Sequence, residues 1–226
     1  MDHVQDWTNR NKMKLNKEKT KLMIFNQTVK YQFSTRIFIE DTLLEIIEET
    51  KLLGILITSD LSWNKNTSML TKKAYARMEI LRKLYCFNVP ILDLITIYII
   101  YIRCYLEQSC VLWHSSLTQE DSNKLERVQK VALRIILKDE YIGYQHALEQ
   151  TELETLEKRR ETLCRNFALS CLKHPMTASM FPLNNINYHE DTSRNREKYF
   201  VQKAKTDRLM KSAIPYMQRL LNDHSK

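Results

Sequence analysis

Glycine and proline are unusually scarce in this chain, with two glycines and four prolines among 226 residues. Turns in β-rich proteins draw heavily on both residues, whereas a helical protein needs few turns. We therefore expect a mainly α-helical fold. The same scarcity excludes glycine-rich phosphate loops and the glycine fingerprint of dinucleotide-binding folds, because neither can be built from two isolated glycines.

Positive charge is concentrated at the two ends of the chain, whose formal net charge is +8. Residues 1–36 carry eight Lys or Arg against three Asp or Glu, and residues 194–226 carry nine against three. Basic segments of this kind suit contact with phosphate backbones, but solvated termini have the same composition. Charge alone leaves both interpretations open.

Cysteine usage indicates a reducing compartment. The five cysteines, at positions 86, 104, 110, 164 and 171, are odd in number and include no CxxC pair, which predicts free thiols. No signal peptide is recognisable, since the N-terminus is polar through Lys21. We expect an intracellular protein, in the cytoplasm or the nucleus.

The first sixty residues predict a short helix over residues 2–13, a polar turn over 16–20 and a small antiparallel sheet. The strands of this sheet are Lys21–Phe25, a hairpin within residues 36–47, and Leu52–Ile57. Gly54 lies inside the last strand. A glycine there usually marks a bulge, or a close approach by another backbone or a ligand.

From Asn66 the hydrophobic period changes from 2 to 3.6, which predicts a helix with one buried and one basic stripe. The apolar residues that share one face are Leu70, Ala74, Met78, Leu81 and Tyr85. The basic residues on the other side are Lys72, Lys73, Arg77 and Lys83.

The next apolar run, Leu94–Ile102, is shorter than the ~20 residues of a membrane span, so we expect a central buried helix and no membrane contact. Arg103 and Glu107 follow it with the i, i+4 spacing of a helical ion pair.

Further helices are expected over residues 119–138, 153–172 and 194–226. Thr118 and Asp121 are spaced as a capping pair for the first of them, with Leu125, Val128, Ala132 and Ile135 facing inward. Gly143 marks a break after that helix, and Pro215 is expected to break the last one. Pro175, Pro182 and residues 184–187 predict a linker.

Catalytic and metal-binding patterns are weak. Cys164, Cys171 and His174 share one side of a predicted helix, but zinc takes four ligands and nothing nearby completes the set. Five pairs of adjacent acids are interpreted as solvated caps and turns: Glu40-Asp41, Glu48-Glu49, Glu120-Asp121, Asp139-Glu140 and Glu190-Asp191. Many of the tyrosines, among them Tyr98, Tyr101 and Tyr105, lie inside predicted helices and are expected in the core.

Six segments nevertheless form an ordered set over nearly the whole chain. They are residues 7–23, residues 51–55 with 60–64, residues 112–114, residues 125–136, residues 156–164 and residues 212–215. In this order they resemble the C-terminal part of the reverse transcriptases of non-LTR (LINE-like, jockey/CR1-like) retrotransposons.

The resemblance implies an α+β chain in which residues 1–63 are the C-terminal edge of a palm with a primer-grip hairpin. Residues 64–140 would be a helical thumb, 141–174 a helical extension, and 175–226 a linker with a basic tail. It further implies that Lys19 lies near an incoming triphosphate and that Leu53 and Gly54 approach the primer backbone. Lys72, Lys73, Arg77 and Lys83 would face an RNA–DNA or DNA duplex.

The chain departs from the family in one respect that decides activity. The metal-binding aspartates of such enzymes have no counterpart, since no Asp-Asp pair occurs in this sequence. We expect a fragment that is inactive alone and holds no cofactor, magnesium belonging to the complete enzyme.

Two alternatives remain open. One is a helical protein-interaction module in which a partner covers the apolar helix over residues 94–113, or in which exposed strand edges drive self-association. The other is a genomic remnant without a selected role.

Overall fold

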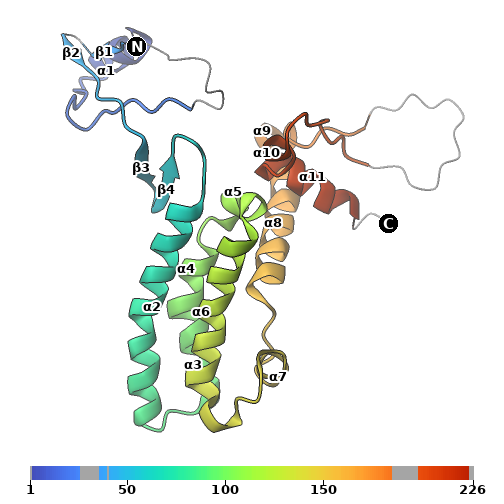
Figure 1. The fold of residues 1–226 in the computed structure, drawn as a ribbon. Coiled ribbons are helices and arrows are strands. Elements are labelled where there is room, and N and C mark those ends of the chain that lie inside the picture. The colour runs from blue at the N-terminus through green and yellow to red at the C-terminus, as the bar shows by residue number, and fades with distance from the viewer. Residues whose placement is uncertain (1, 26–35, 40, 185–197, 224–226) are drawn as a thin grey trace, which may run out of the picture. The chain divides into compact units, whose positions relative to one another are not determined.

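The computed structural model describes residues 2–25, 36–39, 41–184 and 198–223, and is mainly helical with two small antiparallel sheets (Figure 1). The predicted mainly α chain with N-terminal antiparallel strands is thereby confirmed. The chain divides between Asn66 and Thr67 into two compact units, which are described separately.

The first unit begins with helix α1 (Asp2–Arg10). Its first hairpin pairs β1 (Phe38–Ile39) with β2 (Thr42–Leu43), so the hairpin predicted within residues 36–47 is confirmed. The predicted strand at Lys21–Phe25 is wrong. Of these residues only Leu22 pairs, in an isolated parallel bridge with Ile46, and a single bridge leaves its neighbours without a ladder partner among the described residues.

The second hairpin corrects the interpretation of Gly54. The predicted single strand Leu52–Ile57 is wrong, because β3 (Glu49–Leu52) turns back on β4 (Ile55–Thr58). Leu53 and Gly54 form the two-residue turn, with φ of 48° and 89°. Two central residues at positive φ are what a type I′ turn requires, and the twist of that turn matches the twist of paired strands. Gly54 therefore serves a turn and not a bulge.

Helix α2 (Asn64–Cys86) opens the helical part of the chain. Its predicted apolar stripe is confirmed: Leu70, Ala74, Met78 and Leu81 are almost fully buried, and Tyr85 is half-buried. A tight bend after Asn88 leads into the next helical stretch. That stretch comprises α3 (Ile91–Ile97), the π-helical η1 (Tyr98–Arg103), α4 (Cys104–Glu107) and α5 (Cys110–Trp113).

The apolar run after α2 is buried along one face only. Leu94, Tyr98, Ile102 and Leu106 recur at four-residue steps and have no exposed surface, whereas Ile100 is 68% exposed. Arg103 and Glu107 form the predicted ion pair at 3.0 Å. Ile91–Ser116 is the one stretch of the described residues that is long and apolar enough to cross a membrane, by length and composition, criteria that core helices also meet.

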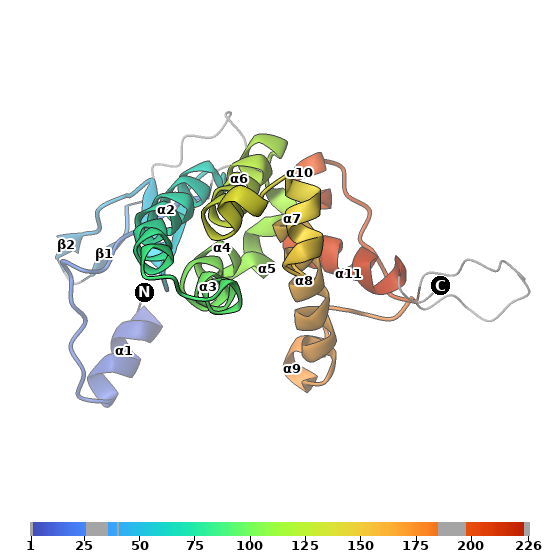
Figure 2. The ribbon, with the colours of Figure 1, turned by 90° about the horizontal axis from the view of Figure 1, so that it is seen from below.

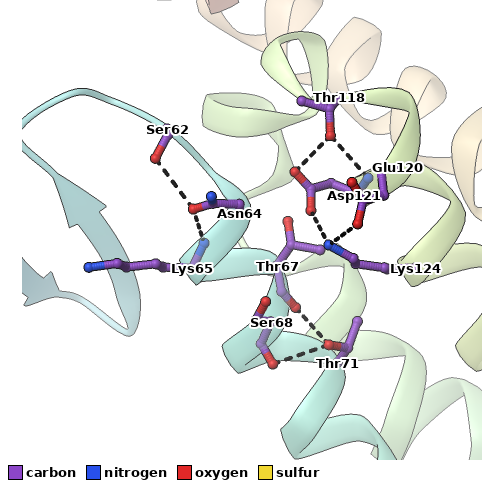
Figure 3. Close-up of polar contacts among 10 residues, drawn as sticks. All are labelled: Ser62, Asn64, Lys65, Thr67, Ser68, Thr71, Thr118, Glu120, Asp121 and Lys124. Carbon is purple, nitrogen blue, oxygen red and sulfur yellow. Dashed lines mark hydrogen bonds and ion pairs between the residues drawn. The ribbon is translucent and has the colours of Figure 1, made fainter.

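The N-terminus of α6 (Gln119–Leu137) confirms the predicted capping pair (Figure 3). The amide of Asp121 donates to Thr118 Oγ1 at 3.1 Å, and this hydroxyl donates to Asp121 Oδ2 at 2.9 Å. The expectation of a solvated acid is wrong for Asp121, which is 3% exposed because its carboxylate serves the cap and an ion pair with Lys124.

Gly143 precedes α7 (Tyr144–Gln150), as predicted, and α8 (Leu156–Leu172) follows. The expected break at Pro215 is wrong, because Pro215 lies in the first turn of a helix over Ala213–Asp223, where a missing N–H removes no helical hydrogen bond. The remaining elements are the 3₁₀ turns η2 (His114–Ser116) and η3 (Lys138–Glu140), with α9 (Pro175–Ala178), α10 (Asp207–Met210) and α11 (Ala213–Asp223). Residues 185–187 of the predicted linker lie outside the described residues.

The helices of the second unit pack around two buried centres. Figure 2 shows α6 against α3 and α4, with α8 on the other side of α5. Gln129 of α6 lies inside the first centre, where it accepts a hydrogen bond from Tyr98 at 2.7 Å and donates to Tyr144 at 3.0 Å. A second apolar cluster joins α8 to α11 through residues that include Cys164, Ala168, Met217 and Leu221.

Candidate nucleic-acid interface

The turn between β3 and β4 presents Leu53 at its tip. Leu53 is 88% exposed and Gly54 is half-buried. The hairpin is tied to the start of α2, because Asn66 Oδ1 accepts from the amide of Leu56 at 3.1 Å and Lys65 pairs with Glu49 at 2.5 Å. The two residues that the resemblance assigns to a primer backbone thus lie together on a turn of defined geometry.

Lys19 lies in the predicted polar turn, with its amide donating to Asn16 Oδ1 at 3.0 Å, and is exposed. Next to this turn the first unit has an open cavity of about 870 Å³, lined in part by Lys14, Lys17 and Lys21. Lys19 is not one of its lining residues. Lys21 pairs with Glu45, which also lines the cavity.

Lys72 and Lys83 lie on the outer face of α2. They are eleven positions apart, which is about three turns of helix and about 16 Å along its axis. Both are exposed, and neither pairs with a carboxylate of the described residues. Glu79, which lies between them, pairs instead with Arg82 at 3.4 Å. These two ammonium groups are therefore available to an external anion.

The other two residues of the predicted basic stripe lie elsewhere on the helix. Lys73 is half-buried. Arg77 also is half-buried, because its guanidinium packs against aromatic rings of the neighbouring helical stretch, at 5.1 Å from the Tyr101 centroid and 3.8 Å from that of Tyr105. Of the four cations, Lys72 and Lys83 are thus exposed, whereas Lys73 and Arg77 are half-buried.

No metal centre is formed by the part of the chain that the structure describes, in which no three His, Cys, Asp or Glu side chains come close enough to share an ion. Cys164 and Cys171 are buried in the apolar cluster between α8 and α11, whereas His174 is exposed. Cys164 instead contacts Cys110, and this thiol pair lowers the pKa of Cys110 and, with burial, raises that of Cys164.

Sequence analysis missed the residues whose role depends on neighbours that are distant in the sequence. The lysines around the cavity come from the predicted turn and its flanks, and the rings that hold Arg77 come from another helix. The i, i+4 spacing of Tyr101 and Tyr105 was the available signal, since it places both rings on one helical face.

Comparisons of the chain with protein-family models, with curated proteins and with solved structures find no match.

Proposed function

We propose that this chain is the palm-edge and thumb part of a non-LTR retrotransposon reverse transcriptase, and that it binds an RNA–DNA or DNA duplex. The ordered motifs along the sequence support the family. The observation that carries the binding function is that Lys72 and Lys83 of α2 are both exposed and that neither forms an ion pair with a carboxylate of the described residues. Cations that are not neutralised by neighbouring carboxylates release counterions when they contact phosphates, which drives sequence-independent binding.

The proposal concerns binding and not nucleotide transfer. Two-metal phosphoryl chemistry requires carboxylates that hold the ions, and the paired aspartates of the family have no counterpart in this sequence. Magnesium would belong to a complete enzyme.

Binding is tested by titrating labelled DNA and RNA–DNA duplexes with the full chain and with a Lys72→Gln/Lys83→Gln variant. Loss of two phosphate contacts is expected to flatten the dependence of log K on log salt by about 1.8. A variant carrying Lys158→Gln and Lys173→Gln, two exposed lysines on and after α8, removes the same charge and controls for it. The proposal fails if the wild-type chain retains no duplex at low salt, or if the α2 variant and the control behave alike.

A partner-binding function is the second candidate, because large apolar side chains are exposed where α2 passes into α3 and where α6 passes into α7. Phe87, Leu92 and Ile142 are 79%, 77% and 80% exposed, and such residues mark interaction surfaces when they gather. Light scattering over a range of protein concentrations tests self-association. A monodisperse monomer at every concentration contradicts it.

A further inference from the structure

The outer face of α6 carries three cations, Arg127, Lys130 and Arg134, and Lys138 follows as the first residue of η3; we call these four residues the α6 row. The first three recur at steps of three and four residues, which places them on one line along the helix. They span about 10 Å at the rise of an α-helix, and Lys138 lies just past the C-terminus of the helix, where its φ is 43°. All four residues are exposed, and Figures 1 and 2 show α6 at the surface with α3 and α4 behind it.

Tyrosine rings hold three of the four cations in place. Lys130 Nζ lies 4.9 Å from the ring centroid of Tyr144, and Arg134 Cζ lies 5.3 Å from that of Tyr141. Lys138 Nζ lies 4.0 Å from the ring of Tyr85, on α2. A long basic side chain loses rotamer entropy when it is ordered. Part of that loss has already occurred here, which favours binding of an anion.

The row is not neutralised by the chain itself. None of its members forms an ion pair with a carboxylate of the described residues. The acids at the start of α6 are engaged elsewhere: Glu120 and Asp121 hold Lys124 at 2.9 and 3.3 Å (Figure 3). Glu126 accepts from the Tyr144 hydroxyl and from the amide of Leu156.

We infer that the α6 row binds the phosphate backbone of a nucleic-acid duplex, as a second contact beside Lys72 and Lys83. A row of neighbouring cations, three of which are held against tyrosine rings, fits a polyanion whose charges are themselves held in line. Single-strand binding usually adds aromatic faces on which bases stack, and here the three rings are half-buried and covered by cations. The duplex is therefore the better fit. The inference rests on the proposed duplex binding.

The test replaces Arg127, Lys130, Arg134 and Lys138 with Gln, which keeps helix propensity while removing the charges. The duplex affinities of this variant and of the wild type are measured between about 50 and 200 mM salt. The α6 variant is expected to flatten the slope of log K against log salt by up to about 3.6, since each lost phosphate contact contributes about 0.9. Circular dichroism checks that the variant is folded.

A control variant carries Gln at Lys173, Lys203, Lys205 and Lys211, four exposed lysines away from α6, and loses the same net charge. The inference is overturned if the α6 variant and this control have the same slope while the wild type binds duplex. It is also overturned if the row affects only a single-stranded probe, or only vesicles of phosphatidylcholine with phosphatidylserine. A wild type that binds no duplex overturns the proposed function itself, and the inference with it.

Discussion

The guanidinium of Arg77 lies 3.8 Å from the ring centroid of Tyr105, and its Nη2 donates to the tyrosine hydroxyl at 2.8 Å. This contact joins α2 to the helical stretch that follows it. Arg77 is thereby bound within the protein, whereas Lys72 and Lys83 on the same helix face outward. One basic stripe in the sequence thus divides into residues that stabilise the fold and residues that can contact a ligand.

Replacing Arg77 with Ala is expected to destabilise the protein by about 1–3 kcal/mol, because a cation–ring contact and a charged hydrogen bond are lost. Urea unfolding followed by circular dichroism measures this. Lys72→Ala is the matched control, and an exposed position should change the free energy of unfolding by less than about 0.5 kcal/mol. Equal effects of the two substitutions would show that Arg77 has no such stabilising contact.

The conformation of the turn between β3 and β4 allows a prediction about the stability of this hairpin. Leu53 has a φ of 48°, a left-handed conformation that costs a residue with a Cβ about 1–2 kcal/mol and that Asn tolerates better. Leu53→Asn should therefore stabilise the hairpin, and Gly54→Ala should weaken it. Amide hydrogen exchange of β3 and β4 reports both, as slower exchange in the first variant and faster exchange in the second. Unchanged exchange in both would contradict a type I′ turn.

We expect the folded protein to lose stability in mild acid because of His114. Its Nδ1 accepts from Arg160 Nε at 3.3 Å, and burial, together with the charge of Arg160, lowers the pKa of His114 from 6.5 to about 4. Between these values the unfolded chain binds a proton that the folded chain does not. Stability from this group is therefore complete above pH 6.5 and is lost as the pH falls toward 4, by about 3 kcal/mol.

The matched variant for this prediction is His114→Gln, whose side-chain oxygen can still accept from Arg160 but does not titrate. Urea unfolding of both proteins at pH 7 and near pH 4 isolates the histidine, because other titrating groups cancel in the difference. The gap between wild type and variant should shift by about 3 kcal/mol in favour of the variant at the lower pH. Parallel curves would mean that His114 titrates normally in the folded protein.

Periodicity predicted α2, α6 and α8 well because each buries one face. The single helix expected over residues 194–226 is wrong, since residues 198–206 are not helical and only α10 and α11 form within the described part of that range. The step from Leu70 to Ala74, Met78 and Leu81 located α2, and the spacing of Thr118 and Asp121 located the start of α6. Strand prediction failed where a partner was required. Lys21–Phe25 has the composition of a strand but lacks a ladder, and Leu52–Ile57 is a hairpin because two residues at positive φ reverse the chain.

The candidate interface was less accessible to sequence analysis. Lys72, Lys73, Arg77 and Lys83 share a basic stripe in the sequence, but Arg77 is drawn against the rings of Tyr101 and Tyr105, which come from the next helical stretch. The α6 row has a spacing that is legible in the sequence, at residues 127, 130, 134 and 138. Its tyrosine partners lie in the segment after α6 and on α2, so only the fold brings them under the cations.

Salt dependence of duplex binding by the unmodified chain tests the central claim most directly. If Lys72, Lys83 and the α6 row together make about six phosphate contacts, the affinity should fall by about a thousandfold between about 50 and 200 mM salt. The fall should be similar for duplexes of different sequence, since backbone contacts carry no sequence information. Absence of binding at the lower salt concentration, or affinity that does not change with salt, would contradict the account.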